Sequence, residues 1–196
     1  MLMKNVTVLC FLIMILTACK KDLKVCKDYK QISGRESKYV TADVPVQQMR
    51  DTLLKYPQLE ITQLSTNQYV TQVMCNVYYQ HLPIFSDFYS MYKNNVLDTL
   101  TVSGSILKSD LNLSLQPTVA HTDAIKEGRK YVNFDHSCIA YQLGLYNKNR
   151  WQNKSPDYRL AWKISDVQKP YLYVIIDAAN KSYLYSEGGR NMYFVD

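Results

Sequence analysis

The stretch from residue 171 to residue 177 reads Tyr-Leu-Tyr-Val-Ile-Ile-Asp, and it decides how the rest of the chain is interpreted. Successive side chains of a strand point to opposite faces, and here both faces are apolar. A strand of this kind is buried on both sides, so we expect it in the centre of a sheet. Asp177 can accept hydrogen bonds from the backbone of a turn, which predicts a hairpin directly after this strand.

The strand candidate before it covers residues 158–164 and carries Leu160 and Trp162 two positions apart. Residues at this spacing share one face, so both side chains are expected in the core. Further strand candidates cover residues 138–146 and 182–185. These four strand candidates follow one another along the chain, and we interpret them as a meander.

The first half of the chain has the same order of elements. Val46, Met49 and Leu53 have helical spacing between Pro45 and Pro57, which predicts a helix there. Strand candidates follow at residues 58–65, 69–79, 84–92 and 96–102, with a break at Leu82-Pro83 and a turn at Lys93-Asn94-Asn95. A second helix is expected over residues 118–132. The order helix, meander, helix, meander predicts an α+β fold of two helix-plus-antiparallel-sheet halves, packed as one unit.

The N-terminus predicts export. Lys4 precedes an apolar run at residues 6–16, which is too short to span a membrane. The following Leu16-Thr17-Ala18-Cys19 resembles the bacterial lipobox, which implies cleavage between Ala18 and Cys19 and lipidation of Cys19. An ordinary secretory signal with a coincidental cysteine is the alternative.

This interpretation divides the N-terminal region into a signal peptide, residues 1–18, and a lipidated tether, residues 19–44. We expect a protein of the cell envelope that is held to a membrane by its lipid anchor, at the outer membrane, on its periplasmic or its surface face. Loss of Lys4 lowers the formal net charge from +6 to +5, and that charge is spread along the chain. No basic-aromatic motif suggests nucleic acid, so none is expected as a partner.

Two segments resemble the propeptides of thermolysin-like metalloproteases. The first comprises Tyr79-Gln80-His81-Leu82-Pro83-Ile84-Phe85, Lys93-Asn94-Asn95-Val96-Leu97 and Val102-Ser103-Gly104, and it resembles the fungalysin/thermolysin propeptide module. The second comprises residues 159–164, Arg-Leu-Ala-Trp-Lys-Ile, and residues 171–180, which end in Asp-Ala-Ala-Asn. It is similar to the PepSY-like half of those propeptides. Order and spacing agree over about residues 45–186.

The resemblance implies a propeptide-like half at residues 45–133 and a PepSY-like half with its tail at residues 134–196. Two residues depart from the pattern, because His81 and Lys181 stand where the family has turn glycines. Glycine adopts positive φ without steric cost, and other residues do so less readily.

In that family the propeptide helps its protease to fold and occupies the cleft until it is cut. A free-standing version implies a lipid-anchored, non-catalytic binding protein that inhibits a secreted zinc metalloprotease in trans or assists its folding. The alternatives are a cell-surface module that binds a glycan or an envelope component, and the remnant of a protease gene. The 17 tyrosines are consistent with a binding platform on a sheet face, or with ordinary half-buried strand positions.

The tail from Ser186 to Asp196 contains the candidate protease contacts. In the resembled propeptides this part of the chain leads toward the protease cleft, which singles out Ser186, Gly188, Gly189 and Asp196. The two glycines would make the tail pliable. The alternative is a frayed terminus.

No catalytic or metal site is expected. A protease of this class needs His-Glu-x-x-His, and the three histidines, His81, His121 and His136, lack that spacing. Asp135-His136-Ser137-Cys138 resembles a nucleophile motif, but neighbouring residues of an extended strand point to opposite faces. We therefore expect no enzyme, no metal ion and no cofactor.

Three cysteines remain beyond the signal peptide and the anchor: Cys26, Cys75 and Cys138. An odd number permits at most one intramolecular disulfide, and their spacing matches no zinc site. Free, buried thiols are the expected state.

Overall fold

The computed structural model describes residues 30–32, 39–107, 110–134 and 138–188. In these ranges the fold is mixed α+β and consists mainly of sheet, with two α-helices. The first half contains η1 (Thr41–Asp43), α2 (Gln47–Lys55), β2 (Leu59–Thr66), β3 (Val70–Tyr79), β4 (Leu82–Asn94) and β5 (Thr99–Gly104). The second half contains α3 (His121–Gly128), β6 (Ile139–Asn147), β7 (Tyr158–Asp166), β8 (Tyr173–Asp177) and β9 (Tyr183–Glu187). A short strand, β1 (Lys30–Gln31), precedes them.

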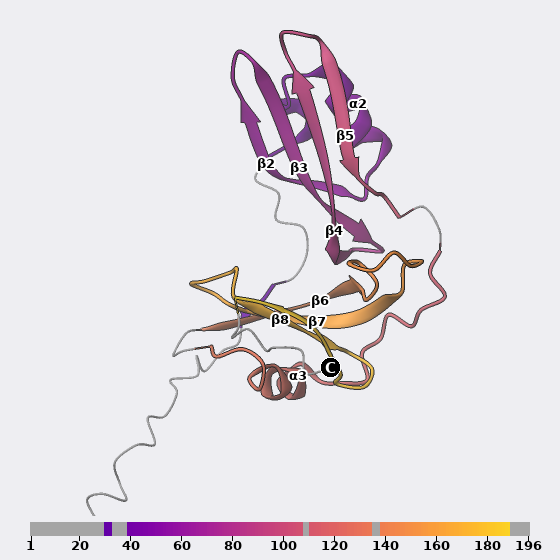
Figure 1. Ribbon diagram of the computed structural model, residues 1–196, viewed down its shortest axis with the longest axis vertical. Coiled ribbons are helices and arrows are strands. Elements are labelled where there is room, and N and C mark those ends of the chain that lie inside the picture. Colours follow the sequence, from indigo (N-terminus) through magenta and orange to yellow (C-terminus); the bar gives the residue numbers. More distant parts are fainter. Residues whose placement is uncertain (1–29, 33–38, 108–109, 135–137, 189–196) are drawn as a thin grey trace, which may run out of the picture.

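Each half is a helix followed by an antiparallel meander, as the sequence predicted. Strands β2 to β5 pair in chain order, and so do β6 to β9. One sheet of nine strands joins the halves in the order β2-β3-β4-β6-β7-β8-β9, with β5 beside β4 and β1 beside β6. Figure 1 shows the two halves one above the other, with the lower end of β4 reaching β6.

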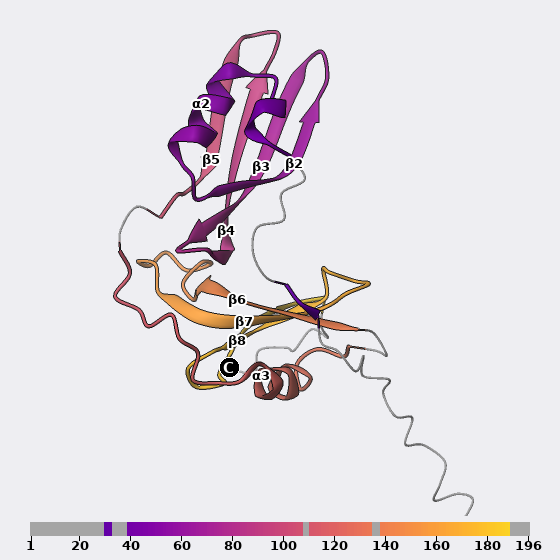
Figure 2. The same cartoon turned by 180° about the vertical axis from the view of Figure 1, so that it is seen from behind.

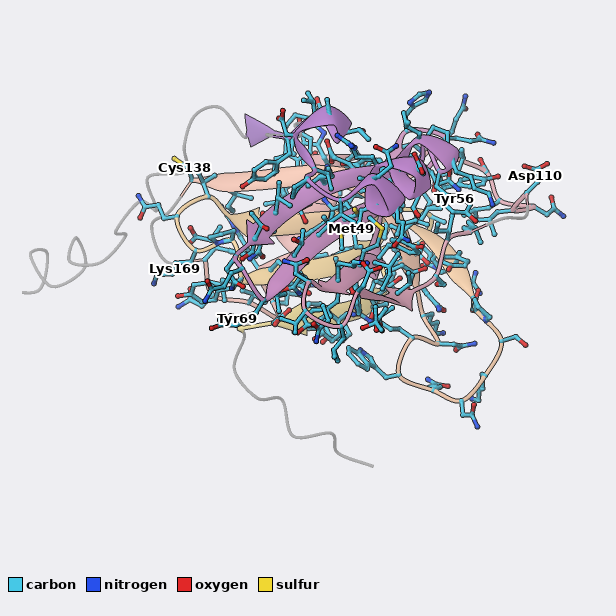
Figure 3. All side chains as sticks on the ribbon, turned by 90° about the horizontal axis from the view of Figure 1, so that it is seen from above. Met49, Tyr56, Tyr69, Asp110, Cys138 and Lys169 are labelled. Atoms are coloured by element: carbon cyan, nitrogen blue, oxygen red, sulfur yellow. The ribbon has the colours of Figure 1, made fainter. Side chains whose placement is uncertain are left out.

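The core of the first half lies between α2 and its sheet. The buried face of α2 carries Met49 and Leu53, which are 0% and 6% exposed. Figure 2 shows α2 lying across the strands, and Met49 is labelled beneath it in Figure 3. On the sheet side the partners include Val73, Cys75 and Met91.

The core of the second half lies between α3 and strands β7 and β8. Trp162 is 7% exposed, and its indole nitrogen donates a hydrogen bond to the Val119 carbonyl oxygen at 2.8 Å. Leu160 lies in the same core, which confirms the prediction that both side chains are buried on one face. Strand β8 has paired neighbours on both sides, and Val174 to Ile176 are fully buried, so its predicted central position is also confirmed.

The two halves meet where β4 runs parallel to β6. Ile84 of β4 is in register with Leu145 of β6, and the Asn147 backbone N–H donates to the Ser86 hydroxyl at 2.9 Å. The Tyr158 hydroxyl donates to the Asp87 carboxylate at 2.6 Å. One hydrophobic cluster includes buried residues of both halves, so the halves share a core.

Part of the segment expected to be a tether belongs to the fold. Lys30 and Gln31 pair with β6 as strand β1, and the Ile32 N–H donates to the Tyr141 carbonyl at 2.9 Å. Val44, which follows η1, is fully buried. Residues 30 and 31 therefore join the sheet through backbone hydrogen bonds. Amino-acid composition does not predict such pairing, because it does not depend on the side chains. The proposed signal peptide and the anchor at Cys19 lie outside the described residues.

The expected boundary at residues 133 and 134 is corrected by the packing of α3. This helix lies against β7 and β8. The packing is so close that a Cβ on Gly128 would lie 2.7 Å from Val174 Cγ1 and 3.2 Å from Ile164 Cδ1. The helix therefore belongs to the second half, and the division falls in the segment between β5 and α3. This packing agrees with the predicted order helix, meander, helix, meander, whereas the boundary taken from the propeptide resemblance assigned the helix to the first half.

Two turns lie away from their predicted positions. The turn between β3 and β4 is formed by Gln80 and His81, and Pro83 is inside β4, opposite Tyr78. The next turn begins after Asn94, whose side-chain oxygen accepts hydrogen bonds from the Val96 and Leu97 N–H groups. Both of those apolar side chains are therefore held in an exposed turn, not in β5.

Candidate functional site

The face of the second half opposite α3 carries a layer of aromatic rings around one lysine. Lys163 of β7, Ile175 of β8 and Tyr185 of β9 lie side by side in register, so they share this face. We call the group Phe85, Tyr146, Lys163, Tyr173 and Tyr185 the aromatic face. Figures 1 and 2 show this side of β6–β8 turned toward the first half, with α3 on the other side.

Small residues make room for the rings. Gly144 and Ala161 are paired neighbours in β6 and β7, and Ala161 is fully buried. Phe85 reaches over Gly144 from β4, so close that a Cβ there would lie 2.5 Å from the ring. Both halves of the molecule therefore contribute to the aromatic face.

The rings lie close to one another and remain partly accessible. The ring centroids of Tyr146 and Tyr185 are 5.9 Å apart, and those of Tyr173 and Tyr185 are 6.0 Å apart. Tyr146 is buried, whereas Phe85, Tyr173 and Tyr185 are half-buried. Half-buried rings with fixed positions can bind a partner with little loss of side-chain freedom.

Lys163 is the cation at the centre of the aromatic face. Its ammonium nitrogen lies 4.4 Å from the centroid of the Tyr173 ring and 5.8 Å from that of Phe85, distances at which cation–π attraction acts. Burial lowers the pKa of Lys163, and the carboxylate of Glu187 opposes that shift. Within the described ranges no carboxylate forms an ion pair with Lys163, so its N–H donors are available to a ligand.

The tyrosines of the aromatic face are neutral donors. Burial, then the proximity of Tyr185, raises the pKa of Tyr146 to about 12. The pKa of Tyr173 is raised by burial, then by its hydrogen bond to Glu187. Arg150 lies close enough to lower both pKa values in part, which places a second positive charge near the rim. The site can therefore hold aromatic or sugar rings together with a carboxylate.

The candidate residues of the tail are only partly described. Ser186 lies inside β9, opposite Val174, so the tail begins later than expected. Gly188 has φ +70°, and a Cβ there would lie 3.1 Å from Leu172, so its conformation and packing favour glycine. Gly189 and Asp196 lie outside the described residues, as do Ala18 and Cys19.

The histidines do not come together with a nucleophile among the described residues. His81 is in the turn between β3 and β4, whereas His121 stacks on Tyr141 with 4.3 Å between ring centroids. Residues 135–137 of the Asp-His-Ser-Cys sequence are outside the described ranges. Cys138 is disulfide-bonded, which corrects the expectation of free thiols, whereas Cys75 is free and buried as expected.

The described residues lack a metal-binding cluster and a membrane-spanning helix. They contain no group of three or more His, Cys, Asp or Glu side chains placed to hold a metal ion. They also contain no helix with the length and apolar character needed to cross a bilayer.

Sequence reasoning missed the aromatic face as a unit. Lys163 stands out in the sequence as a charged residue between Trp162 and Ile164, but the contribution of Phe85 from the other half leaves no such sign. Pairing of β4 with β6 brings residues 85 and 163 together, and no local pattern predicts that pairing.

Comparison with known proteins gives only a weak likeness to solved structures. No protein-family profile matches the sequence, and no curated protein matches it either. Among solved structures, the chain is similar to the Bacillus megaterium YpeB C-terminal domain, with 12% sequence identity and a TM-score of 0.45. The likeness covers 80% of this chain and 68% of that chain. At this level it supports no conclusion about function.

Proposed function

We propose that this chain is a non-catalytic, lipid-anchored binding protein that binds a secreted zinc metalloprotease in trans and inhibits it or assists its folding. The observation that carries the proposal is the aromatic face, in which half-buried rings surround a lysine. The propeptide-like sequence supplies the identity of the partner. The absence of His-Glu-x-x-His from the sequence is consistent with a non-catalytic role.

Backbone conformation supports the propeptide-like interpretation at the two residues that depart from its pattern. His81 has φ +70° and Lys181 has φ +67°, so both adopt the conformation for which the family uses glycine. Asp177 accepts hydrogen bonds from the Ala179 and Asn180 N–H groups at 2.7 and 3.2 Å, as expected for the Asp-Ala hairpin. The turns are thus formed without their glycines.

The aromatic face has the composition of a binding surface. Tyrosine and phenylalanine are enriched at the centres of protein interfaces, and a polar rim commonly surrounds them. Here Glu187 and Arg150 lie near the tyrosines, and Lys163 can pair with a carboxylate of the partner. A specific complex should bury more than about 1,000 Å² in total, so elements near the aromatic face would also take part.

The lipid anchor would keep this interaction at the cell envelope. We propose lipidation at Cys19 and a location at the outer membrane, supported by the lipobox-like sequence. Several buried acyl chains add membrane affinity at about 0.8 kcal/mol per methylene, which gives stable attachment.

Inhibition and complex formation test the proposal. The non-acylated mature chain is mixed with a thermolysin-like enzyme from the same organism, and we expect slower peptide hydrolysis and co-elution in gel filtration. Deletion of residues 189–196 should weaken inhibition if the tail enters the cleft. That truncation keeps β9 intact, whereas truncation after Tyr185 would remove paired residues of β9. Full protease activity at saturating concentrations, with no complex, would contradict the proposal.

The aromatic face also favours a second candidate function, the binding of an acidic glycan of the cell envelope. Sugar rings stack on tyrosine rings, and Lys163 could pair with a uronate carboxylate. Binding to an acidic polysaccharide that Lys163→Gln abolishes, together with no effect on the protease, would select this function.

A further inference from the structure

Glu60 of β2 is a buried carboxylate with only half of its hydrogen-bonding capacity used. It is 7% exposed, and its Oε2 accepts a hydrogen bond from the Tyr78 hydroxyl at 2.5 Å. Its Oε1 has no hydrogen-bond partner among the described residues. Burying a carboxylate oxygen without a donor is unfavourable, so a native structure that retains one calls for an explanation.

The negative charge of Glu60 affects a buried neighbour, Cys75. Burial, then the negative charge of Glu60, raises the pKa of the Cys75 thiol to about 12. Cys75 is therefore a neutral neighbour that offers no compensating charge. Within the described ranges Glu60 also forms no ion pair with a cationic side chain.

Glu60 lines a hollow of about 440 Å³ in the first half. The other lining residues are Tyr39, Val40, Thr41, Leu53, Leu59 and Ile61. Among the described residues of this lining Glu60 is the only charged one, and most of its neighbours there are apolar. Ligand sites of comparable volume combine apolar walls with a few polar groups that fix orientation.

This combination selects the chemistry of a ligand. An ionised carboxylate only accepts hydrogen bonds, and an ammonium group donates three. Val40, Leu53 and Leu59 would contact methylene groups, as apolar surfaces do with the aliphatic part of a lysine side chain. We propose that the hollow binds a primary ammonium group carried on an unbranched aliphatic chain, with Glu60 as its hydrogen-bond acceptor.

The proposed ligand could be the lysine side chain of a partner protein or a free alkylamine. The hollow is formed by η1, α2, β2 and the residues beside η1, whereas Lys163 and the tyrosines of the aromatic face are on β6 to β9. Its occupation is therefore independent of the proposed metalloprotease, and either proposal can fail without the other.

Calorimetric and thermal-shift titrations with n-butylammonium chloride test the inference. We expect saturable binding and a raised Tm, with no such effect from n-butanol or sodium butyrate at matched ionic strength. Glu60→Gln should abolish both signals, because the amide loses the negative charge and keeps the shape. Asp110→Asn, at an exposed position between β5 and α3, is the matched control because it also changes a carboxylate to an amide, and it should bind like the wild type. Equal binding of butylammonium and butanol, or unchanged binding in Glu60→Gln, would overturn the proposal.

A second measurement covers the case in which Glu60→Gln does not fold. In wild-type protein with ¹³C-labelled glutamate, butylammonium should move the carboxyl resonance of Glu60, and butanol should not. Nα-acetyl-lysine N-methylamide is then titrated in the same way. Binding of both amines points to a lysine side chain as an admissible ligand, and binding of butylammonium alone points to a free amine. No movement with either amine would contradict the inference.

Discussion

Gly144 of β6 and Phe85 of β4 lie in direct contact where the two halves of the molecule join. A Cβ on Gly144 would lie 2.5 Å from Phe85 Cζ and equally close to the Pro83 carbonyl oxygen. That distance is too short for any side chain, so glycine permits the approach of β4 to β6. The aromatic face depends on this approach, because it brings Phe85 over the second half.

Gly144→Ala should therefore destabilise the protein. The added methyl group must displace both a ring and a backbone carbonyl, and overpacking of this kind costs about 1–3 kcal/mol. Urea unfolding followed by circular dichroism measures the loss. In a Phe85→Ala background, Gly144→Ala should cost less free energy of unfolding than in the wild type, because the clash with the ring is gone. Part of the cost should remain, because the Pro83 carbonyl oxygen is still in place. A Gly144→Ala midpoint equal to that of the wild type would show that the contact is looser than described.

Trp162→Ala should cost about 3–5 kcal/mol in free energy of unfolding, because a large buried side chain is removed. Trp162→Phe keeps a ring in the core and removes the hydrogen bond to the Val119 carbonyl, which is worth about 1 kcal/mol. The difference between the variants separates packing from hydrogen bonding. A near-neutral Trp162→Ala would place the ring outside the core.

Glycine at the two strained turn residues should stabilise the protein. A non-glycine residue in the left-handed conformation costs about 1–2 kcal/mol, and His81 and Lys181 both adopt it. We expect His81→Gly and Lys181→Gly to raise Tm in thermal unfolding. Lys181→Ala is the control, since it also removes the ion pair with Asp123 but keeps the strain. A lower Tm in both glycine variants would contradict the turn conformations.

Tyr146 should contribute to unfolding at high pH. Burial raises its pKa from 10 to about 12, so the folded protein retains a proton that the unfolded chain loses. This contribution to stability is complete below about pH 10 and is lost as pH rises through about 12. Tyr146→Phe should therefore show a shallower loss of stability between pH 10 and pH 12. Unfolding midpoints for both proteins across this range measure the effect, and identical slopes would contradict it.

Cys19→Ala should abolish acyl labelling and release the protein into the soluble fraction, if Cys19 carries the lipid. Metabolic labelling with a fatty-acid analogue and detergent partitioning are the measurements. Unchanged partitioning in the variant would exclude this anchor.

Local patterns in the sequence predicted most of the regular structure. Burial on one face explains the shared face of Leu160 and Trp162 and the helical spacing of Met49 and Leu53. Burial on both faces explains the continuous apolar run around Ile175. Buried positions are occupied mainly by apolar residues, which can be recognised in the sequence. The hairpin at Asp177 was predictable because its side chain stabilises the turn through local hydrogen bonds.

Long-range pairing was not predictable in this way. Strand β1 contains only Lys30 and Gln31, which carry no apolar signal, and it is held by backbone pairing with β6. The close contact of helix α3 with β8, which Gly128 permits at Val174, is likewise a relation between residues far apart in the sequence. The β4–β6 pairing brings Phe85 close to Lys163 in the aromatic face. The sequence shows how many tyrosines the chain has, but it does not show which of them lie together on this face.

The most direct test of the proposed function is the affinity of single-residue variants for the purified catalytic domain of the metalloprotease. We predict that Lys163→Gln and Tyr173→Ala each weaken binding by about tenfold or more, as expected for residues at the centre of an interface. Tyr69→Ala is the matched control, since Tyr69 is an exposed tyrosine in the turn before β3, away from the aromatic face. It should bind within about twofold of the wild type, as peripheral residues do. Equal affinities for all four proteins, or no binding by the wild type, would contradict the proposal that the aromatic face binds the protease.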